Sequence, residues 1–198
     1  KRRGYNFSQS KAENIYRTAS DLIAVFPKDD NTKLLIRQAV SLLNTASRTV
    51  ESLRTEMNRL AATLPEYPVV MGMEGVGTTL RPQLIAEIGD VTRFPHRGAL
   101  TAFAGVDPGK NESGDYSQRS VPTSKKGSPH LRKTLFQIMD SLIKRSPCGD
   151  PVYDFLDKKR SEGKPYYVYM TAGMNKFLRI YYGRVNEYLS QLEETKES

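Results

Sequence analysis

The sequence has few residues of the kinds that support disulfide, zinc or redox chemistry. Among its 198 residues are one cysteine, two histidines and no tryptophan. A single thiol excludes an internal disulfide, and one cysteine with two histidines does not make up a zinc set. We therefore expect Cys148, which lies in a Pro-Cys-Gly turn, to be an isolated thiol, and we expect no cofactor or metal site here.

Long apolar runs are also missing. No stretch approaches the roughly 18 apolar residues that a membrane-spanning helix needs, and no charged-then-apolar signal segment opens the chain. We expect a soluble, cytoplasmic protein with no membrane partner. Because the first residue is Lys1 rather than methionine, we also expect a fragment of a longer protein.

Acidic residues are fewer than basic ones. Thirty Lys and Arg against 22 Asp and Glu give a net charge of +8, which favours a polyanionic partner such as nucleic acid. Most of the excess lies within 110–145, where eight basic residues oppose three acidic ones. A charge run is commonly only a solvated face, but this one coincides with a long polar loop and the start of a helix.

The apolar residues recur at spacings of three and four, and no alternating strand pattern longer than a few residues is present. The class predicted is all-α. We expect helices over 10–26, 128–145 and 166–192, with Leu131, Leu135, Ile138, Met139 and Leu142 as the buried side of the second. On the third we expect the buried side to hold Met170, Met174, Leu178, Tyr181, Val185, Tyr188 and Leu192.

A fourth helix, of about thirty residues, is predicted over 36–64. Its apolar residues have the period of a coiled-coil seam: Ile36, Ala39, Leu43, Ala46, Val50, Leu53, Met57, Leu60 and Leu64. The seam fits packing on helices of its own chain and fits a dimer or inter-domain arm equally well. Because two prolines in "PEYP" end the pattern, we place a coiled-coil linker or dimerisation arm over 1–66 and a compact helical domain over 67–198.

The segment 69–105 has the features of a helix-hairpin-helix module. A Gly75-Val76-Gly77 turn precedes a helix that we expect to begin at a Thr78/Thr79 cap, and Gly89 and Gly105 are predicted to end the two short helices. In such modules the glycines let the backbone approach a phosphate. A plain tight turn that needs glycine for its geometry is the alternative.

The segment 106–127 is a long polar loop and thus a candidate for function. Ser128 as N-cap and Pro129 at the first helical position start the next helix. Lys125 and Lys126 lie just ahead of this start, where backbone donors and positive charge favour phosphate. Ser113 lies in the same loop, but no neighbouring base or nucleophile elbow distinguishes it from an ordinary loop serine.

Four ordered motifs together resemble a known family. They are "GMEGVGTTLRPQLIAEIGDVTRFPHRGALTAFAGVDP", "ESG", "TSKKGSPHLRKTLFQ" and "GKPYYVYMTAGMNKFLRIYY". Over about 65–185 the chain resembles the C-terminal transposase domain of the insertion-sequence 110 family, with a coiled coil before it in the expected place.

The resemblance implies a DNA recombinase of a mobile element. Such enzymes have an N-terminal RuvC-like domain with a DEDD metal site, a coiled-coil linker and a helical domain, and they are guided by a structured RNA. It implies DNA, a guide RNA and a further copy of the chain as partners, a bacterial or archaeal cytoplasm, and Mg²⁺ in the RuvC-like domain. No stretch before residue 65 supplies strand-borne carboxylates, so we expect this chain to bind nucleic acid but not to cleave it alone.

The family's serine nucleophile, which attacks a DNA phosphate, matches Ser113. Ser117, Ser120 and Ser124 are nearby rivals, and "SKKG" has Lys126 where the family has arginine, which keeps the charge but loses the bidentate fork. The predicted nucleic-acid-binding residues are Gly75, Gly77, Lys110, Arg119, Ser124, Lys125, Lys126, His130 and Arg132.

Two other functions remain open from the sequence. One is a non-catalytic helix-hairpin-helix scaffold for nucleic acid, and the other is a coiled-coil oligomeriser whose charge only confers solubility. Five tyrosines also suggest base stacking or a tyrosine nucleophile, but their helical spacing favours packing in the core or at an interface: Tyr166, Tyr167, Tyr169, Tyr181 and Tyr182.

Overall fold

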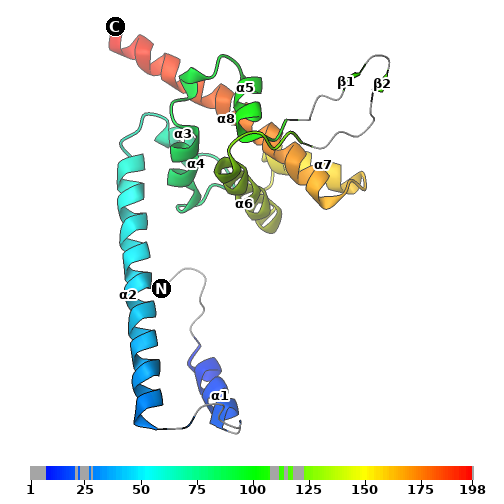
Figure 1. Ribbon diagram of the computed structural model, residues 1–198. Helices are drawn as coiled ribbons and strands as arrows, with labels where there is room; N and C mark the ends of the chain where they lie inside the picture. The colour runs from blue at the N-terminus through cyan, green and yellow to red at the C-terminus, as the bar shows by residue number, and fades with distance from the viewer. Residues whose placement is uncertain are drawn as a thin grey trace. The chain divides into compact units, whose positions relative to one another are not determined.

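The computed structural model describes residues 8–20, 22, 27, 29–107, 112–113, 116–117 and 123–197 (Figure 1). Its elements are helices, apart from one hairpin of two-residue strands among the residues described. The predicted all-α class is therefore confirmed. The chain divides into two compact units, Lys1–Glu51 and Ser52–Ser198. The predicted boundary at "PEYP" and the subdivisions based on it stay predictions.

The first unit holds α1 (Gln9–Ser20) and the beginning of α2 (Asp30–Ala61). The Ser8 hydroxyl oxygen accepts a hydrogen bond from the Lys11 N–H at 3.3 Å, as expected of an N-cap. Residues 21 and 23–26 of the predicted first helix lie outside the described residues. The predicted long helix is confirmed, since α2 has 32 residues, but it begins six residues before the predicted 36 and ends three residues before the predicted 64.

The seam of α2 is not buried. Its larger side chains are exposed, from 40% at Met57 to 66% at Leu43. Only Ala61 is buried on this helix. The apolar period that the sequence shows thus leaves a long apolar stripe accessible.

The second unit is built around α8 (Tyr166–Glu197). This helix packs against α3 (Tyr67–Met71), η1 (Val91–Arg93), α5 (Arg97–Ala104), α6 (Pro129–Arg145) and α7 (Pro151–Ser161), while α4 (Leu80–Ile88) packs on α6. All five residues expected on the buried side of α6 are fully buried. On α8 the first five expected residues are buried and the last two, Tyr188 and Leu192, are half-buried.

Most helix ends agree with the sequence. The Ser128 hydroxyl oxygen accepts from the Leu131 N–H at 3.1 Å, so Ser128 is the N-cap of α6. Gly89 and Gly105 end α4 and α5 with φ of +64°. Of the predicted Thr78/Thr79 cap of α4, the Thr79 part is wrong, because the Thr79 side chain makes no capping hydrogen bond. The Leu80 and Arg81 N–H groups donate to the Gly77 carbonyl oxygen at the start of this helix.

The tyrosines divide into two groups. Tyr169 and Tyr181 are buried, and the half-buried Tyr182 donates its hydroxyl to the Phe94 carbonyl oxygen at 2.9 Å. Packing is confirmed for these three, and burial raises the pKa of Tyr181 above its ordinary value, which keeps the phenol neutral. Tyr166 and Tyr167 are 42% and 74% exposed, so core packing is wrong for them, and packing at an interface stays a prediction. Within the described residues no helix is both long and apolar enough to span a membrane.

Two glycines of α8 should respond oppositely to the same substitution. A Cβ at Gly173 would overlap the Leu156 side chain of α7, whereas Gly183 has nothing within 4 Å of that position. We expect Gly173→Ala to lower the free energy of unfolding by about 1–2 kcal/mol through overpacking. We expect Gly183→Ala to raise it by about 0.5–1 kcal/mol through helix propensity. Urea unfolding of both variants is the measurement, and changes of the same sign would contradict this packing of α7 on α8.

Candidate nucleic-acid interface

The two ends of the predicted serine loop meet at one place in the fold. Residues 105–107, after α5, lie against residues 124–128, before α6, and we call these two segments the clasp. The Ser124 N–H donates to the Asp107 carbonyl oxygen at 3.1 Å, and the Lys125 N–H donates to the Gly105 carbonyl oxygen at 3.2 Å. The clasp therefore fixes where the loop leaves the helical domain and where it returns.

A side-chain bond reinforces the clasp. The Ser124 hydroxyl donates to Asp107 Oδ1 at 2.6 Å, a short bond to a charged acceptor of the stronger kind. Ser124 is half-buried. Its hydroxyl hydrogen is thus used within the clasp, which makes Ser124 less suited than an exposed serine to attack a phosphate.

Two helices hold the first segment of the clasp. Asn175, on α8, donates its side-chain N–H to the Val106 carbonyl oxygen at 2.6 Å. Arg132, on α6, donates Nη1 to the Ala104 carbonyl oxygen at 3.0 Å, and this carbonyl belongs to the last turn of α5, where helical carbonyls lack intrahelical donors. The half-buried Arg132 therefore has a structural bond besides its predicted role.

Two glycines allow the segments of the clasp to approach this closely. A Cβ at Gly127 would overlap the Phe103 carbonyl oxygen and the Gly105 nitrogen, and one at Gly105 would lie 2.7 Å from Arg132 Nη1 and from the Gly127 nitrogen. Gly105 also has φ +64°, in the region that favours glycine. Any larger residue would push the two ends of the loop apart.

Exposed cations surround the start of α6. Lys125, Lys126 and His130 are exposed there, and the helix N-terminus adds partial positive charge. Lys125 has φ +51°, which is uncommon for a residue with a side chain. Glu87 is an opposing charge, because its carboxylate accepts a hydrogen bond from the Ser128 hydroxyl at 3.2 Å.

The Gly75–Gly77 turn lies elsewhere on α6. Gly75 is buried with φ +78°, and a Cβ there would lie 2.7 Å from Leu142 Cγ. The close approach to α6 alone accounts for this glycine, in line with the tight-turn alternative. Arg132 and Leu142 are ten residues apart, roughly 15 Å along the helix at 1.5 Å per residue. The structure therefore does not bring the turn and the clasp together, and the role of Gly75 and Gly77 toward phosphate stays a prediction.

The loop itself is described only in part. Ser113 belongs to β1 (Glu112–Ser113), which pairs antiparallel with β2 (Tyr116–Ser117), so that Ser113 lies opposite Tyr116. Its side chain lies outside the description, as do Lys110, Arg119 and Ser120. The structure thus defines the base of the loop, which is the clasp.

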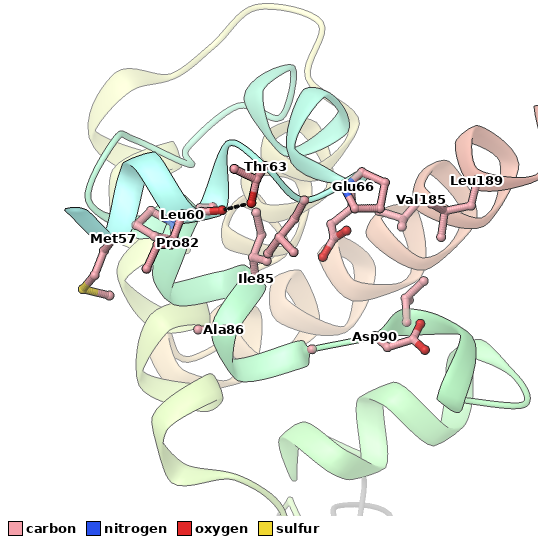
Figure 2. Close-up of a pocket in the computed structure, with 15 residues that line it drawn as sticks. Met57, Leu60, Thr63, Glu66, Pro82, Ile85, Ala86, Asp90, Val185 and Leu189 are labelled. Atoms are coloured by element: carbon pink, nitrogen blue, oxygen red, sulfur yellow. Dashed lines mark hydrogen bonds between the residues drawn. The ribbon is translucent and has the colours of Figure 1, made fainter. Parts of the chain in front are cut away.

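The second unit contains an apolar pocket of about 610 Å³ that the sequence did not predict. Side chains from α2, α4 and α8 surround it, and Met57, Leu60 and Leu64 are the last three members of the seam (Figure 2). Asp90 lies at the pocket, and hydrogen bonds from the Thr92 hydroxyl and backbone N–H lower the pKa of its carboxyl. The lining has no nucleophile with a neighbouring base, so it fits packing rather than catalysis.

The described residues do not fit a metal site, since no three of their His, Cys, Asp and Glu side chains gather where an ion could bind.

Comparison with known proteins finds similarity that includes much of the second unit. Residues 67–154 match the family described as Transposase IS116/IS110/IS902 family. This part of the chain is thus similar to the transposase domain of that family. The chain is also similar to a Streptomyces coelicolor protein described as "Insertion element IS110 uncharacterized 43.6 kDa protein", with 24% identity over 157 residues. That match covers 79% of this chain but 38% of the relative. The resemblance identified from the four motifs is confirmed.

Proposed function

We propose that this transposase chain binds nucleic acid and supplies Ser113 as the nucleophile of DNA strand exchange, together with a RuvC-like domain that holds a divalent metal. The observation that carries the proposal is the clasp. It anchors the loop that contains Ser113 beside exposed cations, within the region that matches the transposase family.

The proposed step conserves the number of phosphoester bonds. The Ser113 hydroxyl oxygen forms a bond to phosphorus, and the bond from phosphorus to a deoxyribose oxygen breaks. The serine proton ends on the departing sugar hydroxyl. Because the protein–DNA ester keeps the energy of the broken bond, a second sugar hydroxyl can reverse the step and rejoin a new strand.

The residues of the clasp and of the start of α6 have separate tasks in this proposal. Lys125, Lys126 and His130 bind the phosphate backbone, with their positive charge and the N-terminus of α6 acting on the same anion. Arg132 and Ser124 position the loop through the bonds already described.

The exposed seam supports a further copy of the chain as a partner. Apolar stripes of this length on a helix are commonly buried against a second helix, and the final seam residues lead into the apolar pocket. We propose that α2 associates with the α2 of another copy, and that part of the basic surface binds a structured guide RNA.

Salt dependence of DNA binding tests the nucleic-acid part. If several phosphates are contacted, log affinity for duplex DNA should fall with log salt with a slope of several units, at about 0.9 per phosphate. The double variant Lys125→Ala/Lys126→Ala should reduce the slope by about 2, measured by fluorescence anisotropy between 50 and 200 mM salt.

The matched control is Lys11→Ala/Lys158→Ala, which removes two exposed lysines outside the clasp and should leave the slope nearly unchanged. Equal losses in both double variants would contradict the assignment to Lys125 and Lys126. A wild-type slope near zero would favour the coiled-coil oligomeriser instead.

A further inference from the structure

Three aromatic rings, one half-buried and two exposed, form a cluster where α8 begins beside α6. The Tyr166 and Tyr167 ring centroids are 5.3 Å apart, and the Phe136 centroid lies 6.0 Å from Tyr166 and 6.3 Å from Tyr167. These separations are those of favourable ring pairs. We call Phe136, Tyr166 and Tyr167 the aromatic platform.

The platform is anchored on one side and open on the other. Tyr169, 9% exposed, lies edge-on to Tyr166 with centroids 5.4 Å apart, which ties the platform to the core. Tyr167 is 74% exposed, so most of its side chain is accessible. A single exposed aromatic ring would need no explanation, but adjoining rings that form one open apolar surface are a candidate binding site.

Cations flank the platform. On α6, Lys133, Phe136, Asp140 and Lys144 follow at spacings of three, four and four, which places them on one face of the helix. Lys144 donates to Asp140 Oδ2 at 2.6 Å, so the acidic group on this face is compensated. Lys133 and Lys164, the latter two residues ahead of Tyr166, are both exposed.

This combination fits one class of ligand. Surfaces that bind single strands combine aromatic rings, on which bases stack, with basic residues that follow the phosphates. Paired bases in a duplex hide their faces, and an apolar protein partner would gain little from the surrounding lysines. We propose that the aromatic platform binds unpaired bases of a single-stranded nucleic acid. This inference rests on the proposed function, because it assumes that the chain binds nucleic acid, but it concerns a surface other than the clasp.

A single indole provides the test. Because the chain has no tryptophan, Tyr167→Trp introduces the only indole, and its emission should be quenched when a base stacks on it. We expect quenching by a single-stranded oligo(dT) but not by an abasic oligonucleotide with equally many phosphates. Met71→Trp, at a half-exposed position of α3 outside the platform, is the control and should not respond. Oligo(U) in parallel shows whether RNA binds in the same way.

Affinity provides a second measurement. By anisotropy, Tyr167→Ala should weaken binding of oligo(dT) about tenfold, in the range known for one base–aromatic stack, and leave duplex binding unchanged. Tyr167→Phe keeps a ring and should bind as the wild type does. Duplex binding with no indole response and no loss in Tyr167→Ala would overturn the platform but leave the proposed function standing. Absence of binding to every nucleic acid would overturn both.

Discussion

Ser113→Ala should abolish the covalent protein–DNA adduct that the proposed strand exchange forms when the chain acts together with a RuvC-like domain. Alanine has no oxygen to form the phosphoester, and a residue that forms the bond to substrate is not replaced by binding energy elsewhere. We expect at least about a thousandfold less adduct. Affinity for DNA should stay close to wild type, because the clasp and its cations do not include Ser113. The measurement is denaturing electrophoresis of end-labelled target DNA after incubation with enzyme, guide RNA and Mg²⁺.

Ser117→Ala and Ser120→Ala are the matched controls for this experiment, since each removes one hydroxyl from the same loop. Both should keep the adduct. If it survives in Ser113→Ala and disappears in either control, the nucleophile is the other serine. If it survives in all three, the chain acts as a nucleic-acid scaffold and another residue performs the chemistry.

Gly127→Ala should have the largest effect on stability. The added Cβ would overlap two backbone atoms of the opposite segment of the clasp, and backbone cannot rotate away as a side chain can. Either the segments separate, with loss of the bonds between them, or α5 and α6 shift. We expect the free energy of unfolding to fall by about 3 kcal/mol, measured by urea denaturation.

Gly77→Ala is the control for that change. A Cβ at Gly77 has nothing within 4 Å, and such a substitution generally alters stability by less than about 1 kcal/mol. An unchanged unfolding midpoint for Gly127→Ala would contradict the close approach of the two segments. Gly127→Ala should also reduce adduct formation by Ser113, because the loop would no longer start from a fixed base.

Local patterns in the sequence predict most of the helical fold. The start of α6 could be predicted from Ser128, Pro129 and the apolar residues that follow, because capping and helical periodicity act over a few residues. The same reasoning was wrong for Thr79, where two backbone bonds to Gly77 satisfy the helix start without a side chain. Core packing was also wrong for Tyr166 and Tyr167, since spacing along a helix does not show where the neighbouring helices end.

Local sequence patterns could not predict the hydrogen bonds that hold the clasp together. The partners Ser124 and Asp107 are 17 residues apart, and Asn175 and Val106 are 69 apart. Asp107 and Asn175 carry no local signal, because an Asp before a proline and an Asn on a helix occur for many reasons. The aspartate lay inside a motif of the family resemblance, yet its partner became known only from the fold.

The fixed base of the loop limits how far the proposed nucleophile, Ser113, can travel. Ser113 follows Asp107 by six residues, and an extended chain spans at most about 3.5 Å per residue. Its Cα therefore stays within roughly 20 Å of Asp107, whatever the loop does. A group confined to so small a sphere meets a docked phosphate at an effective concentration in the millimolar range or above. In the proposed reaction, any domain that presents the DNA must therefore bring the scissile phosphate within the distance of the clasp that Ser113 can reach.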